Sequence, residues 1–100
     1  MTLPRTLDMR RETTTTEGSG PFVLSGVPSP EFLPIPNVGD PGYAFRIVDL
    51  QTGRWVIFKG TVATTTGIKR VTVVSVQSNS SGTTSMLSLG AGTKEVSIII

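Results

Sequence analysis

YAFRIVDLQTGRWVIF, residues 43–58, is the stretch that decides the fold. Its first half alternates apolar and polar side chains, so Tyr43, Phe45 and Ile47 fall on one face of a strand. Residues 51–53 supply a short connection that ends in glycine, and an apolar run then returns to residue 58. Two such runs joined by a short loop are typical of a β-hairpin. The sequence therefore predicts two antiparallel strands here.

Segments rich in β-branched residues, separated by turn residues, continue on both sides of this hairpin. Fifteen Thr and eleven Val among 100 residues favour strands over helices, because branched side chains fit a pleated surface. Gly60 is expected to mark a bulge or a close backbone approach, after which residues 61–63 continue the strand. The chain is therefore expected to be all-β, without a helix, as a small antiparallel β-sandwich or open barrel. The further strands are expected at residues 22–24, 61–63, 68–76, 86–89 and 94–100.

The chain contains no cysteine and no histidine. This excludes a disulfide, a thiolate nucleophile, Cys- or His-ligated metals and a Ser–His–Asp triad. A pair of carboxylates remains formally open as a catalytic site. Acidic side chains on a solvated surface explain these residues better, so we expect neither an enzyme nor a cofactor. The carboxylates concerned are Glu31, Asp40, Asp49 and Glu95.

Nine basic and seven acidic residues give a net charge of +2. After position 45 the basic residues outnumber the acidic ones, a pattern that suits nucleic acid or an acidic protein surface. These charges are dispersed and are not interleaved with aromatic residues, so nucleic-acid binding is not expected. No apolar segment approaches the ~20 residues that span a membrane, and the N-terminus lacks the apolar core of a signal peptide. A soluble chain without a membrane partner is expected.

The first twenty residues are polar and rich in Thr, and two glycines close them. They predict an extended N-terminal arm over residues 1–20, followed by a single β-domain over residues 21–100. Two interpretations of the arm stay open, a flexible tail or a segment that orders on a neighbouring subunit. The Thr run at residues 13–16 suits a strand added to a neighbour.

Five prolines make residues 27–42 an extended loop instead of a helix or a central strand. Phe32, Leu33 and Ile35 within this loop are too apolar to be left in water. They are expected either to cover the core or to dock on a partner.

Residues 98–100 are three adjacent isoleucines, which a strand directs to alternate faces. Both faces then need cover, and oligomerisation is favoured over burial within the monomer. Arg70 lies among apolar strand residues and calls for a carboxylate, in the same domain or across an interface. Trp55 and Tyr43 are expected in the core. The candidate subunit-contact residues are Thr13, Thr14, Thr15, Thr16, Phe32, Ile35, Arg70, Ile98, Ile99 and Ile100.

Several segments follow one another in a recognisable order. They are an Arg-rich entry into a Thr run (10–17), a strand between glycines (18–26), a Tyr-containing strand (43–49), Gly53-Arg54-Trp55, Gly60-Thr61, Ile68-Lys69-Arg70-Val71-Thr72-Val73, a Ser/Asn/Gly turn (78–82) and a strand with an Ala-Gly-Thr turn (87–96). Together they resemble a small β-rich domain of tailed-bacteriophage virion structural proteins, of the decoration or fibre-associated type. The resemblance covers residues 10–97. The Pro-rich stretch at 28–41 departs from the family pattern, and the chain ends too soon to be a long fibre itself.

The resemblance implies a virion structural protein without catalysis, made in the host cytoplasm. Two locations are open, a decoration or cement protein on the capsid and a protein that anchors fibres on the tail. Its expected partners are other virion proteins and further copies of itself, with a trimer as one option. A carbohydrate-binding β-module for attachment to the host surface is the alternative function.

Overall fold

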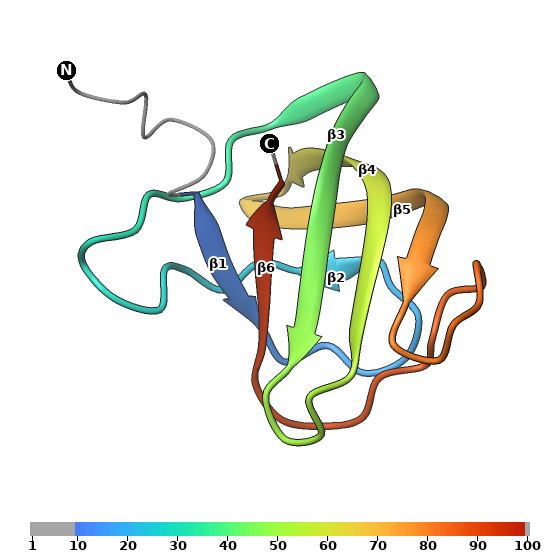
Figure 1. The fold of residues 1–100 in the computed structure, drawn as a ribbon. Helices are drawn as coiled ribbons and strands as arrows, with labels where there is room; N and C mark the ends of the chain where they lie inside the picture. Colours follow the sequence, from blue (N-terminus) through green and yellow to red (C-terminus); the bar gives the residue numbers. More distant parts are fainter. Residues whose placement is uncertain (1–9, 100) are drawn as a thin grey trace, which may run out of the picture.

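The computed structural model describes residues 10–99, and all of its regular structure is antiparallel β-sheet (Figure 1). The all-β prediction is therefore confirmed for the described residues, which contain no helix. The strands pair in the order β1-β6-β3-β4-β5-β2. They are β1 (Arg11–Thr14), β2 (Phe22–Val23), β3 (Val38–Asp49), β4 (Trp55–Thr65), β5 (Ile68–Asn79) and β6 (Lys94–Ile98).

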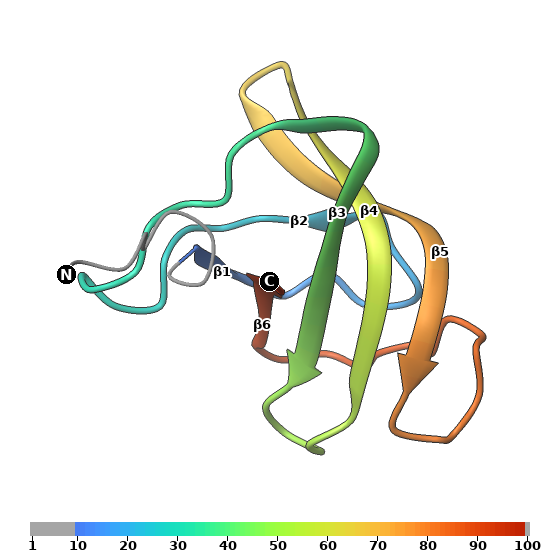
Figure 2. The same ribbon diagram turned by 45° about the horizontal axis from the view of Figure 1, so that its top comes forward.

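The two ends of this strand order also meet. The backbone N–H of Thr13 in β1 donates to the carbonyl oxygen of Gly26 at 2.8 Å, just beyond β2. In return, the N–H of Ser25 donates to the carbonyl oxygen of Thr13, also at 2.8 Å. The sheet therefore curls into a nearly closed barrel, as Figure 2 shows from a second direction. This closure corresponds to the open-barrel form of the predicted fold.

The predicted hairpin forms β3 and β4, and its alternation fills the barrel. Phe45 faces Phe58 across the two strands, and their rings stack with centroids 5.6 Å apart. Such an aromatic pair adds about 0.5–1.5 kcal/mol beyond the burial of its apolar area. The buried apolar residues are Phe22, Leu24, Ile35, Val38, Phe45, Ile47, Val56, Phe58, Val62, Val71, Leu89, Val96 and Ile98.

Two glycines let β3 and β4 approach closely. Gly42 has a φ of +86°, and a Cβ there would overlap the carbonyl oxygen of Gly60. The register between β4 and β5 shifts between Lys59 and Gly60, but the extra residue there is Val74, so the bulge lies in β5 and not at Gly60. A Cβ at Gly60 would lie 2.6 Å from the carbonyl oxygen of Thr72, which confirms the close backbone approach predicted there. Only glycine fits this approach without strain.

The boundary predicted for an N-terminal arm is wrong within the described residues. β1 pairs with β6 of the same chain, from Arg11 opposite Ser97 to Thr14 opposite Lys94. Thr14 is completely buried. This part of the predicted arm therefore belongs to the barrel wall, while residues 1–9 lie outside the described residues.

Two other predicted boundaries change. The Pro-rich segment ends earlier than residue 42, because β3 already begins at Val38. The strand expected at residues 86–89 is reduced to a single bridge, in which Leu89 and Gly18 exchange two backbone hydrogen bonds of 2.7 and 2.9 Å. This bridge ties the segment that follows β1 to the segment that precedes β6.

Candidate interaction surface

The outer face of the β3–β4 hairpin carries apolar side chains. Val56 and Phe58 of β4 point into the core, so Trp55 before them and Ile57 between them point outward and are only half-buried. Val48 of β3 lies opposite Trp55 and is also half-buried. The barrel therefore presents an apolar strip, made of Val48, Trp55 and Ile57, on its outside.

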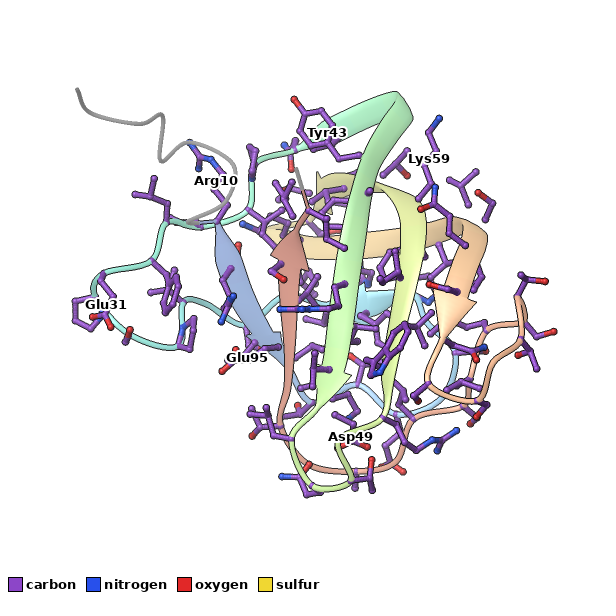
Figure 3. The ribbon with its side chains drawn as sticks, in the orientation of Figure 1. Arg10, Glu31, Tyr43, Asp49, Lys59 and Glu95 are labelled. Atoms are coloured by element: carbon purple, nitrogen blue, oxygen red, sulfur yellow. The ribbon has the colours of Figure 1, made fainter. Side chains whose placement is uncertain are left out.

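Basic side chains border this apolar strip. Arg46 of β3 is exposed and lies opposite Ile57, and Lys59 is the next outward residue of β4. Figure 3 shows the labelled Lys59 directed away from the barrel. Arg54 lies opposite the buried Asp49 and alternates with Trp55, so it is not part of this face; its Nη1 donates to the carbonyl oxygen of Ser88 at 3.3 Å. The face thus combines an apolar centre with two cations, Arg46 and Lys59.

The carboxylate on the neighbouring strand is already paired. Glu95 of β6 lies opposite Val48, and its Oε1 accepts a hydrogen bond from Nη1 of Arg11 at 3.1 Å. Between the described side chains there are two ion pairs, Arg11 with Glu95 and Lys69 with Glu12. Neither pair includes a cation of the hairpin face. The face is therefore positively charged.

β5 forms an exposed part of the barrel wall. β2 pairs with β5 only at Arg70 and Val71, so within residues 10–99 the following residues of β5 pair only with β4. Val74 lies in this part and is 57% exposed. The register with β4 shifts on both sides of Ser75, where Val74 and Gln77 are extra residues. Such bulges at an edge hinder pairing with a further strand.

A buried ion pair fixes the Pro-rich segment to the barrel. Glu12 is only 2% exposed and forms an ion pair with Lys69 of β5. Its two oxygens also accept hydrogen bonds from the backbone of Gly26 at 3.1 Å and of Ile35 at 2.8 Å. Nζ of Lys69 donates to the carbonyl oxygen of Ile35 at 2.6 Å. Four separate segments thus converge on one carboxylate.

Three of the predicted subunit-contact residues are buried inside the monomer. Thr14 is covered in the barrel, and Ile35 and Ile98 belong to the apolar core. The same chain covers their side chains. The prediction that they contact another subunit at the surface is therefore corrected: they are buried positions of the monomer. For Ile35 the structure selects the interpretation in which the loop covers the core.

The other predicted contact residues are scattered. Thr13 and Thr16 are half-buried and bonded within the barrel, Thr13 to Gly26 and Thr16 to the N–H of Val23 at 3.0 Å. Thr15 is exposed. Phe32 is half-buried, and the guanidinium of Arg11 lies over its ring. Cζ of Arg11 is 4.7 Å from the centroid of the Phe32 ring.

Of the remaining three residues, the structure describes two. Ile99 is half-buried, and its N–H donates to the carbonyl oxygen of Ala44 at 2.9 Å. Arg70 is half-buried on the outside of β5, which removes the need for a buried partner. Ile100 lies outside the described residues. The nine described residues therefore do not form one surface.

Trp55 and Tyr43 are not core residues, contrary to prediction. Tyr43 alternates with Phe45 in the sequence but is 41% exposed, although Val38 and Val62 farther along the same strands are buried. Trp55 has the opposite orientation from Val56, which is buried. Residues 55–58 are all apolar, so the sequence alone did not show which of them point inward.

Two charged or polar side chains are buried at the β3–β4 end of the barrel, where Figure 3 labels Asp49. Asp49 accepts a hydrogen bond from the N–H of Gln51 at 3.0 Å and so stabilises the hairpin turn. Lys94 lies opposite Asp49 in the register, and its Nζ donates to the carbonyl oxygen of Gly92 at 2.9 Å.

Among the described residues there is no cluster of three or more acidic side chains that would hold a metal ion. They also contain no helix long and apolar enough to cross a membrane.

Comparison with protein-family models, with curated proteins and with solved structures finds no match for this chain.

Proposed function

We propose that this chain is a non-enzymatic structural protein of a tailed-bacteriophage virion. It assembles on the capsid as a decoration or cement protein, or on the tail as a protein that anchors fibres. The observation that carries this proposal is the order of segments over residues 10–97 that resembles the virion domain. The pairing of β1 with β6 supports it, because the first and last of those segments belong to one barrel.

The surface of the barrel suits a part that works by contact. Its outer wall combines half-buried Trp55 and Ile57 with exposed Arg46, a mixture of aromatic, aliphatic and Arg residues that is enriched at protein interfaces. Such a wall supplies binding area without catalytic groups. The partners in this proposal are other virion proteins and further copies of the chain.

Quantitative mass spectrometry of purified virions from the source phage tests the proposal. A decoration protein is expected at hundreds of copies per particle, and a fibre-anchoring protein at a few to a few dozen, because both follow the symmetry of their site. Absence of the chain from the particles overturns both. Light scattering of the purified chain tests the homo-oligomer separately, with a trimer as one option.

A carbohydrate-binding module is the second candidate, and the position of Trp55 favours it. An indole on the outside of a sheet offers a flat apolar surface for a sugar ring. Binding to a glycan array that disappears in Trp55→Ala, but persists in Phe32→Ala, would support this function. A still-folded wild-type chain that binds no glycan on the array would reject it.

A further inference from the structure

We propose that the outer face of the β3–β4 hairpin docks on an acidic protein surface. This face consists of Val48, Trp55 and Ile57 at its centre and of Arg46 and Lys59 beside it. The inference names the chemistry of the partner in the assembly role proposed above and rests on that role.

The apolar centre supplies the area that binding needs. Trp55 and Val48 lie directly opposite each other, and Ile57 follows Trp55 on the same outward face. In an antiparallel pair such opposite side chains lie within about 4.5–5.5 Å at Cβ, so the three form one continuous strip. Trp is among the residues that contribute most to binding when a partner covers them.

The charges select the partner. Arg46 and Lys59 take part in neither ion pair of the described side chains, and the nearby Glu95 is neutralised by Arg11. A positive rim around an apolar centre complements a surface with carboxylates around its own apolar residues. A second copy of this chain would bring the same cations face to face and would be repelled. The charge pattern therefore favours a different, acidic protein.

A sugar ligand fits this face less well. Sugar hydroxyl groups need hydrogen-bond acceptors beside the aromatic ring, since a buried hydroxyl without a partner costs free energy. On this face Val48 and Ile57 lie next to Trp55 and accept no hydrogen bonds, and the hydroxyl of Ser80 on the β5 side is already engaged by the backbone N–H of Trp55 at 3.1 Å. The closest carboxylate across the strands, Glu95, is engaged by Arg11. The face thus resembles a protein contact more than a sugar site.

Carbodiimide cross-linking tests the docking. The affinity-tagged chain is isolated from the producing cells in its native complex and treated with a water-soluble carbodiimide. This reagent joins a lysine amine to a nearby carboxylate as an amide and itself takes up the water that is removed. The purified chain treated in the same way is the control, because it gives only links within the chain or between its copies.

We expect Lys59 to be linked to an Asp or Glu of another polypeptide. We also expect Arg46→Glu to reduce recovery of that polypeptide by about tenfold or more, because like charges then meet in the contact. Arg70→Glu is the matched control, since it makes the same charge change on β5 and is expected to keep the partner.

Several results would overturn the docking. They are recovery of the chain without a partner, other cross-links between the chain and its partner without any link from Lys59, and an equal loss of partner with Arg70→Glu. Attachment of a glycan to the Trp55 face instead of a protein would also overturn it. The proposed function is tested separately: it requires that the isolated complex is a virion or a part of one. A virion complex without the Lys59 link leaves that function standing while it rejects the docking.

Discussion

Glu12 and Lys69 form an ion pair between β1 and β5, although 57 positions separate them in the sequence. The pair lies where the barrel closes and where the Pro-rich segment passes over it. Glu12 also holds the backbone N–H groups of Gly26 and Ile35. One side chain therefore links the closure of the barrel to the position of the loop that covers it.

Glu12→Ala is expected to lower the free energy of unfolding by roughly 3 kcal/mol. The substitution leaves two backbone donors and the Lys69 ammonium without their acceptor, and breaking such a buried pair is costly. Urea denaturation followed by circular dichroism measures the change. Glu95→Ala removes the more exposed pair with Arg11 and is expected to cost at most about 1 kcal/mol. Equal losses for the two variants would contradict the role of Glu12.

Sequence alternation predicted the hairpin but not the strand that closes the barrel. In β3 and β4 the inward positions are occupied by Phe45, Ile47 and Phe58, so an apolar pattern marks them. In β1 the inward positions are Glu12 and Thr14. Hydrogen bonds satisfy these polar groups after folding, so they can be buried. The sequence therefore has no apolar pattern in β1 from which their burial could be predicted.

The error on Trp55 has a different physical origin. Successive residues of a barrel strand point alternately to the inside and to the outside of the wall. Because Val56 and Phe58 point inward, Trp55 points outward. Size alone placed the indole in the core. The cations of the same face were visible in the sequence as a basic second half, but their grouping depends on cross-strand register, which pairs Arg46 with Ile57.

Trp55→Ala is expected to lower the free energy of unfolding by only about 1–2 kcal/mol. The indole is half-buried on the outside, so its truncation removes part of an apolar contact and leaves no internal cavity. Phe58→Ala empties a fully buried position and is expected to cost about 3–5 kcal/mol. Chemical denaturation of both variants under one set of conditions provides the comparison. A larger loss for Trp55 than for Phe58 would place the indole in the core after all.

Asn79→Asp is expected to destabilise the turn that follows β5, by about 1–3 kcal/mol. The amide nitrogen of Asn79 donates to Thr83 Oγ1 at 2.7 Å and to the Ser85 carbonyl oxygen at 2.6 Å. Its oxygen accepts from the N–H groups of Ser81 and Thr83 at 3.0 Å each. Aspartate keeps the acceptors but sets a carboxylate oxygen against the Ser85 carbonyl. Amide hydrogen exchange should quicken at residues 80–85, and an unchanged exchange pattern would reject this role.

Gly42→Ala is expected to be much more harmful than Gly53→Ala. Both glycines have a positive φ, so either alanine is strained by about 1–2 kcal/mol. At Gly53 the space for a Cβ is open, whereas at Gly42 it is filled by the Gly60 carbonyl. The Gly42 variant must therefore push β3 away from β4 in addition. Thermal unfolding measures both, and similar melting temperatures would show that the strands separate there without cost.

Deletion of residues 1–20 is expected to abolish cooperative unfolding of the isolated chain. It removes β1, uncovers the side of β6 on which Arg11–Thr14 pair with residues 94–97, and leaves Lys69 without Glu12. A detachable arm would give the opposite result, a folded domain that has lost only its assembly. A chain that begins at Arg10 keeps every one of these contacts and is the control, expected to retain a single cooperative transition. Circular dichroism during urea titration distinguishes the two outcomes. Because β1 contributes polar residues to the inside of the wall, its loss acts through hydrogen bonds and the ion pair more than through lost apolar area.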